Sequence, residues 1–294
     1  IGRLARVAAS APRPYRIVVL SDHGQSQGAT FRQRYGETLR DVVAAAIADD
    51  RVEAYVGTDE GWQSVSALLT EMAARDGRGR TMVQRALRRG RGLGDDEVVL
   101  PPGRPPRLRP AQEVRPDGGV IVLASGNLGL ISFAAWQHRL TLEEIEAAYP
   151  ALVPALARHP GIAFVLVRSA THGPVAIGAG GVRVLATGDV AGTDPLAPFG
   201  PLAAASLREI DGFDNAPDIL VNSMYDPETG EVAAFEELVG SHGGLGGFQN
   251  EPFLLYPATL AAPDEIVGAE ALHRLFRDWM AEGRPEGRRD GAAR

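Results

Sequence analysis

The sequence predicts an α/β fold, in which strands and helices alternate along the chain. Short apolar runs rich in β-branched residues, such as residues 15–20 and 162–167, are bounded by turn residues and are typical of buried strands. Between such runs, apolar residues recur at helical spacing, for example at residues 37–48. Two short apolar runs on either side of Gly180 and Gly181 indicate a hairpin, so we also expect some antiparallel strands.

The elements follow one another along the chain in a regular order. The runs that we expect to form strands are residues 15–20, 120–124, 162–167, 175–177, 182–185, 218–222 and 252–256. The predicted helices are residues 37–48, 62–74, 140–156, 201–208 and 269–280. The third helix begins at a capping box of Thr141 and Glu144. Because ligands of open α/β sheets bind beyond the carboxyl ends of strands, the polar residues 21–24 after the first strand are the first place to look for a site.

Composition excludes several classes of protein. The net charge of −7 argues against a general nucleic-acid or anionic-membrane binder, since such proteins collect phosphates with a positive field. All 30 basic residues are arginine, which excludes a lysine nucleophile, a Schiff base and a P-loop lysine. The chain has no cysteine, so disulfides, thiolate metal sites and cysteine nucleophiles are excluded as well. The most apolar stretch, residues 120–136, is too short and too interrupted for a transmembrane helix, so we expect a soluble domain.

The basic charge is concentrated in one insert, at about residues 75–118. Residues 75–115 hold 11 arginines and 5 acidic residues, which gives this segment a net charge of +6. Six prolines at residues 101–116 are incompatible with regular secondary structure there. The insert is either a solvated loop or an electrostatic lip that draws in an anionic substrate.

The six histidines differ in their surroundings. His138, His159 and His273 lie in or beside predicted helices, with no carboxylate motif nearby, and we expect them to be surface or packing residues. His172 follows a strand and is a weak candidate for a functional residue. The two stronger candidates are His23 and His242.

Each of these two histidines lies in a distinctive motif. Asp22 and His23 come directly after a predicted strand, and a carboxylate beside an imidazole suits a divalent metal such as zinc. His242 is followed by glycines at 243, 244, 246 and 247, which would allow the backbone to pack tightly around an ion or anion. The alternatives are a surface turn at His23 and a flexible loop with an incidental histidine at His242.

Taken in order, these motifs resemble a known family. A strand, then Ser-Asp-His-Gly at 21–24, a long insert and finally Ser-His-Gly-Gly at 241–244 before an apolar strand resemble the C-terminal half of the alkaline phosphatase superfamily, particularly its type I phosphodiesterase/nucleotide pyrophosphatase-like branch. Residues 21–39 (SDHGQSQGATFRQRYGETL) also resemble actinobacterial proteins of that group that are described as phage-holin-family or membrane-linked phosphatase-like proteins. The resemblance covers residues 12–280.

The resemblance implies a fold, a site and a reaction. The fold would be an alkaline phosphatase-like central sheet flanked by helices, incomplete at its N-terminal side, with residues 1–294 as the C-terminal part of one domain. Asp22 and His23 would bind one divalent metal ion, and His242 would bind a second. Two such ions, zinc in this family, can stabilise the attacking and leaving oxygens of an in-line displacement at phosphorus.

Part of the family's machinery is missing from this sequence. The family also uses a Thr or Ser nucleophile close to an early Asp ligand, together with an Asp-x-x-x-His pair of ligands. None of the six histidines has an aspartate four residues before it. We therefore expect the nucleophile and the remaining ligands to lie upstream of Ile1, while a non-catalytic relative remains the alternative.

The functional prediction is a metal-dependent phosphoric-ester hydrolase, either a phosphatase or a phosphodiesterase. Its partner would be a small phosphate ester or an envelope substrate, with no nucleic acid, and it would contact a membrane only through a part outside this chain. One alternative is a membrane-associated scaffold that keeps the phosphatase fold without catalysis. Another is a transferase that moves a phospho-group to an alcohol acceptor. Metal content separates the hydrolase from the scaffold, and product analysis with added acceptors separates it from the transferase.

Residues 1–294 alone are predicted to show no phosphatase or phosphodiesterase activity and to bind zinc poorly. Three protein ligands divided between two ions leave each ion short of the three or four donors that zinc sites use. The measurement is hydrolysis of an activated phosphate ester by the purified 294-residue chain. Robust turnover that is lost in His23→Ala would show that a nucleophile lies within this chain.

Overall fold

The computed structural model describes residues 1–48, 52–56 and 119–282, which divide into two compact units. The first unit consists of residues 1–22 and 252–294, and the second runs from His23 to Glu251. Each unit is described by itself below. The helix predicted at residues 62–74 and the Pro/Arg-rich insert at residues 75–118 lie outside the described residues.

The first unit combines two helices with a two-stranded ribbon. Its elements are α1 (Gly2–Ala9), β1 (Val19–Leu20), β10 (Leu254–Leu255) and α9 (Gly268–Glu282). Strands β1 and β10 pair in antiparallel register, with Val19 opposite Leu255. Trp279 of α9 is buried, and its indole N–H donates to the carbonyl oxygen of Ala261 at 2.5 Å, which holds the helix against the segment that follows β10.

The prediction of a buried strand at residues 15–20 is wrong in length and in burial. Only Val19 and Leu20 form a strand, and Tyr15 and Leu20 are 53% and 43% exposed. The reason is that β1 has a single neighbour, β10, instead of a place within a larger sheet. Apolar, β-branched composition alone does not distinguish these two environments.

The second unit is a mixed α/β structure built on an eight-stranded sheet. Its strands are β2 (Val52–Val56), β3 (Val120–Ser125), β4 (Leu128–Phe133), β5 (Ile162–Ser169), β6 (Gly173–Gly178), β7 (Gly181–Val184), β8 (Val190–Gly192) and β9 (Ile219–Ser223). They lie in the order β2-β3-β4-β9-β5-β6-β7-β8. The pairing of β2 with β3 is parallel, and every other pairing between neighbours in this sheet is antiparallel.

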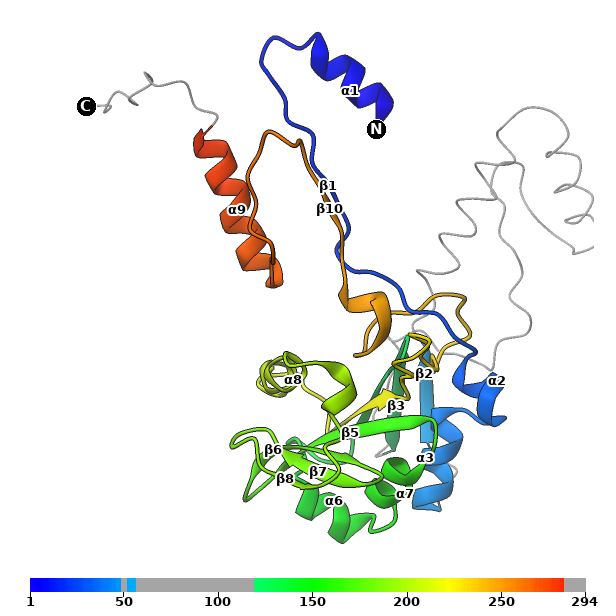
Figure 1. Ribbon diagram of the computed structural model, residues 1–294. Coiled ribbons are helices and arrows are strands. Elements are labelled where there is room, and N and C mark those ends of the chain that lie inside the picture. Colours follow the sequence, from blue (N-terminus) through cyan, green and yellow to red (C-terminus); the bar gives the residue numbers. More distant parts are fainter. Residues whose placement is uncertain (49–51, 57–118, 283–294) are drawn as a thin grey trace, which may run out of the picture. The chain divides into compact units, whose positions relative to one another are not determined.

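Helices cover both faces of this sheet, as Figure 1 shows. The helices are α2 (Phe31–Tyr35), α3 (Leu39–Ile47), α6 (Leu142–Ala148), α7 (Leu152–Arg158) and α8 (Ala203–Asp211), with short 3-10 turns η2 (Ala197–Phe199) and η3 (Gly247–Asn250). Alternate residues of β5 serve two hydrophobic cores: Val165 and Val167 belong to the core with α3, α6 and α7, whereas Phe164 and Leu166 pack with Leu207 of α8. A strand with both faces covered in this way reads as a continuous apolar run.

Most of the predicted elements are confirmed within the described residues. The strands at 120–124, 162–167 and 218–222, the hairpin around Gly180 and the helices near 37–48, 201–208 and 269–280 all form within a few residues of the predicted bounds. Thr141 caps α6 with the expected capping box. The helix predicted at 140–156 is instead divided into α6 and α7, because Pro150 disfavours helical geometry at Tyr149. Helices α1 and α2 and strands β2, β4 and β8 were not predicted.

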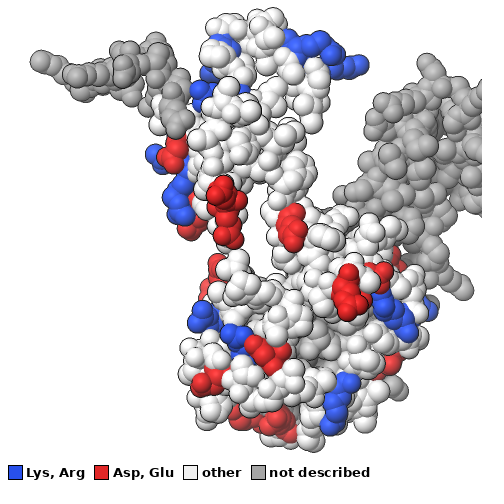
Figure 2. Space-filling view, in the orientation of Figure 1, with Lys and Arg blue, Asp and Glu red and all other residues white. Residues whose placement is uncertain are grey.

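Two further features of the described residues are the distribution of surface charge and the length of the apolar helices. On the face of the second unit in view in Figure 2, acidic and basic side chains are interspersed among uncharged residues. No helix in the described part of the chain is both long enough and apolar enough to cross a membrane.

A buried carboxylate ties three segments of the second unit together. Asp218, directly before β9, is 6% exposed and accepts hydrogen bonds from the backbone amides of Phe133 at 2.8 Å and Leu140 at 2.6 Å. It therefore links the end of β4 and the segment leading into α6 to the centre of the sheet.

Asp218→Ala is predicted to destabilise the chain by about 3 kcal/mol, because it leaves two buried amide donors without an acceptor. Asp218→Asn, which keeps one carbonyl oxygen, should cost less. Urea unfolding measures both effects, and Asp214→Ala at an exposed position nearby is the control. A loss in Asp218→Ala no larger than that in the control would contradict the anchoring role.

Candidate functional site

The two histidine motifs meet at one edge of the second unit. The segment that starts at His23 runs alongside the loop that contains His242, and an antiparallel bridge joins Ser26 to Ser241. The two backbone hydrogen bonds of this bridge measure 2.9 and 2.8 Å. Both serines are buried, so the bridge is a fixed part of the fold.

The side chains of His23 and His242 are direct neighbours. Their ring centroids lie 3.9 Å apart and the rings meet edge to face, at an interplanar angle of 65°. Both histidines are half-buried. Most of the second unit lies between them in sequence, so this proximity results from the tertiary fold.

A backbone contact indicates which nitrogen of His23 carries the proton. Nδ1 of His23 lies 2.6 Å from the carbonyl oxygen of Gly24. Because a carbonyl oxygen can only accept, Nδ1 is the donor, and in the neutral ring Nε2 then holds the lone pair. This arrangement, with one ring nitrogen bound to a backbone carbonyl, is the one that metal-binding histidines commonly use.

The backbone of His242 packs against a glycine in the turn between β3 and β4. A Cβ atom at Gly126 would lie 1.8 Å from the carbonyl oxygen of His242, and the φ angle of Gly126 is +57°. The amide of Gly126 donates to the carboxylate of Glu236, which is 5% exposed. The β3–β4 turn, the His242 loop and Glu236 therefore form one tightly packed group.

The other predicted site residue, Asp22, is the last residue of the first unit's N-terminal segment. Of the three predicted site residues, only His23 and His242 belong to the second unit, so the site is described there by these two side chains. Among the described residues, no group of three or more His, Asp or Glu side chains is arranged to hold a metal ion. Two imidazoles are of the donor type that zinc prefers, but they are fewer than the three or four donors of a zinc site.

The remaining histidines have other surroundings. The side chain of His138 is 60% exposed and contacts Glu144 at 3.2 Å. His159 stacks on Phe31, with ring centroids 4.8 Å apart, and is a packing residue. His273 is exposed on α9.

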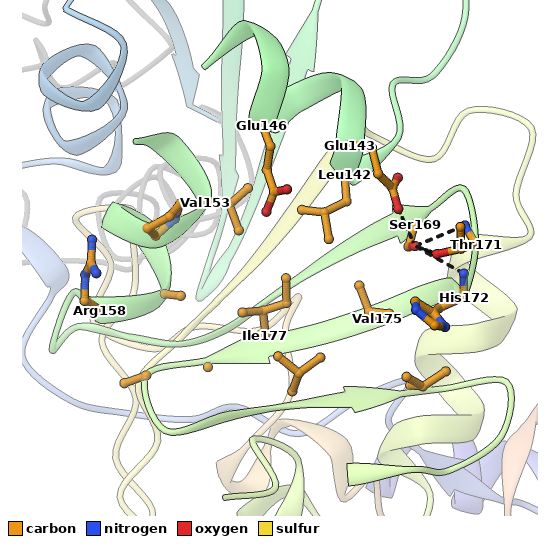
Figure 3. Close-up of a pocket in the computed structure, with 16 residues that line it drawn as sticks. Leu142, Glu143, Glu146, Val153, Arg158, Ser169, Thr171, His172, Val175 and Ile177 are labelled. Carbon is orange, nitrogen blue, oxygen red and sulfur yellow. Dashed lines mark hydrogen bonds between the residues drawn. The ribbon is translucent and has the colours of Figure 1, made fainter. Parts of the chain in front are cut away.

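His172 lines a separate groove of about 620 Å³ between the helices α6 and α7 and the strands β6 and β7. Figure 3 shows an apolar floor that includes Val175 and Ile177, with Arg158 towards one end and His172 at the other. Glu143 borders the groove and fixes the β5–β6 turn. Hydrogen bonds from the Ala170 amide and the Ser169 hydroxyl lower the pKa of the Glu143 carboxyl below its usual value.

Several residues of the histidine site escaped prediction from the sequence. Gly126, Asn127, Asn222 and Glu236 surround the His242 loop, and none of them belongs to the two histidine motifs. One signal was present: Gly126-Asn127 between two apolar runs is typical of a two-residue hairpin turn. The contacts of Asn222 and Glu236 depend on pairing between distant segments, for which the sequence carries no local pattern.

Comparison of the chain with protein-family models, with curated proteins and with solved structures finds no match.

Gly126→Ala is predicted to destabilise the second unit by more than about 2 kcal/mol and to displace His242, because the new methyl group would overlap a backbone oxygen. Gly36→Ala is the matched control: Gly36 also has a positive φ, +77°, but open space surrounds its Cβ position. We expect the control to cost only about 1 kcal/mol of conformational strain. Urea unfolding and the amide chemical shift of His242 measure the two effects, and equal losses would argue against a close contact at Gly126.

Proposed function

We propose that this chain is the C-terminal part of a metal-dependent phosphoric-ester hydrolase of the alkaline phosphatase type. The observation that supports this most directly is the contact between His23 and His242, with ring centroids 3.9 Å apart. The resemblance of the two motifs implies that these side chains bind neighbouring metal ions about 4 Å apart, and such ligands must lie close together.

In this proposal each residue of the motifs has a defined task. His23 directs its Nδ1–H at the carbonyl of Gly24 and so presents Nε2 as the ligand atom. Asp22, the preceding residue, would bind the same ion, and His242 would bind the second. The ions would stabilise the attacking and leaving oxygens of phosphoryl transfer. The protein's own contribution is to hold the two imidazoles side by side on segments joined by the Ser26–Ser241 bridge.

The proposal places the nucleophile and the remaining ligands outside residues 1–294. The lack of an Asp-x-x-x-His pair in the sequence supports this. The ribbon in the first unit supports it too. Two strands alone are marginally stable in water, and Leu20 and Leu255 of the ribbon are 43% and 63% exposed. Additional strands beside the ribbon would give the central sheet of the proposed domain.

In the natural full-length protein, His23→Ala and His242→Ala are each predicted to reduce turnover of an activated phosphate ester at least 100-fold, because loss of a ligand removes or misplaces its ion. His138→Ala is the control, since its side chain is exposed and bonds Glu144 away from the site. Steady-state kinetics with nitrophenyl mono- and diesters measures the effect. Similar losses in all three variants would contradict the assigned roles.

Metal analysis of the same proteins separates a hydrolase from a non-catalytic scaffold. The wild-type protein should hold close to two divalent ions per chain, and the two site variants should hold fewer while remaining folded. A wild-type protein without bound metal would favour the scaffold.

A further inference from the structure

Two buried asparagines hold the loop that follows His242 by its backbone. Asn127 lies in the β3–β4 turn and Asn222 near the end of β9, and their side chains are 0% and 1% exposed. They come from neighbouring strands, because Leu128 pairs with Asn222 in the β4–β9 ladder. Asn127 forms hydrogen bonds with Gly244 and Leu245 of the loop, and Asn222 forms its loop hydrogen bonds with Leu245.

The contacts use the donor and the acceptor of each amide. Oδ1 of Asn127 accepts from the amide of Gly244 at 2.9 Å, and its Nδ2 donates to the carbonyl of Leu245 at 2.9 Å. Oδ1 of Asn222 accepts from the amide of Leu245 at 2.7 Å, and its Nδ2 donates to the same carbonyl at 3.2 Å. Turning either amide over would set an NH2 group against an N–H donor, so the network itself fixes both orientations.

The loop has a glycine where the asparagines close on it. A Cβ atom at residue 244 would lie 2.7 Å from Oδ1 of Asn222 and 2.8 Å from Oδ1 of Asn127. No larger residue fits without opening these contacts. Gly244 is thus explained by the approach of two side chains and not by the flexibility of the loop.

These contacts restrict His242 from one side while the Ser26–Ser241 bridge restricts it from the other. Ser241 is hydrogen-bonded through its backbone amide and carbonyl to Ser26, and Gly244 is held by Asn127. Only His242 and Gly243 lie between the two fixed points. The backbone is therefore held on both sides of His242, by Ser26 at residue 241 and by Asn127 at residue 244.

We propose that Asn127 and Asn222 are positioning residues that hold the imidazole of His242 beside His23. Their effect on the ring pair is independent of any reaction. The consequence for metal binding rests on the proposed function. Buried amides that satisfy loop backbone groups are well suited to this task, since they lock one loop conformation where apolar side chains would only fill space.

The test is a nuclear Overhauser cross-peak between the ring protons of His23 and His242 in the histidine-labelled 294-residue chain. We expect it in the wild-type protein and expect its loss in Asn127→Ala and Asn222→Ala. Leu156→Ala is the control: Leu156 is fully buried in α7, and its truncation lowers global stability without touching the loop. Retention of the cross-peak in both folded asparagine variants would overturn the proposal, as would its loss in Leu156→Ala.

A second variant keeps the proposal testable if the alanine variants do not fold. Gly244→Ala leaves both asparagines in place but forces their Oδ1 atoms away from the backbone, so it should also abolish the cross-peak. Gly36→Ala, with an unobstructed Cβ position, is its matched control and should retain it. An unchanged cross-peak in Gly244→Ala would overturn the proposal.

Zinc binding by the natural full-length protein tests the link to function separately. Each asparagine variant should weaken zinc affinity at least tenfold, within the range seen when a group that orients a ligand is removed. Unchanged affinity together with a lost cross-peak would overturn the link to metal binding. A wild-type protein that binds no zinc, with the cross-peak behaving as expected, would overturn the proposed function and support the positioning role alone.

Discussion

The pairing of β5 with β9 is the constraint on which the second unit depends. The register sets Leu166 opposite Leu220 and Val167 opposite Ile219, so each pair enters a different hydrophobic core. A slip of one residue would exchange the two sets of side chains between the faces, which is why the register is strongly specified. The same register fixes Asn222 at the end of β9, next to the turn that carries Asn127. The positions of the two asparagines beside the His242 loop thus depend on strand pairing at the centre of the sheet.

The sequence was informative wherever local pattern and environment agree. The run at 162–167 predicted β5 because a strand covered on both faces needs apolar residues throughout. Strand β4 escaped because Gly129 and Ser132 interrupt its pattern. The glycine has a packing reason: a Cβ atom there would lie 2.3 Å from the side chain of Leu39, so α3 lies directly against the strand. The run at 15–20 was wrongly predicted to be a buried strand, because its apolar residues lie in or beside a two-stranded ribbon where they remain partly exposed.

The residues of the candidate site also fall into two groups, those that the sequence pattern indicates and those that it does not. His23 and His242 stand out in the sequence because one follows Asp22 at the end of an apolar run and the other precedes a cluster of glycines. Gly126, Asn127 and Asn222 do not stand out, because their roles are contacts with backbone groups of the loop at residues 242–245. Burial of an asparagine is decided by its tertiary partners, and composition gives no hint of it. Histidines in a distinctive local motif are therefore easier to recognise in a sequence than the buried residues that hold a loop in place.

The hydrogen bond between the amide of Gly24 and the carbonyl of Gln249, at 3.0 Å, shows that the second unit begins and ends at one point. The flanking residues are also paired, since the amide of Ser21 donates to the carbonyl of Phe253 at 3.2 Å. In sequence, the second unit is an insertion between the two segments of the first. A module of this kind can grow or shrink internally without changing the span between its two connections. Long and variable insertions could accumulate inside such a module while the two histidines near its ends stay in register.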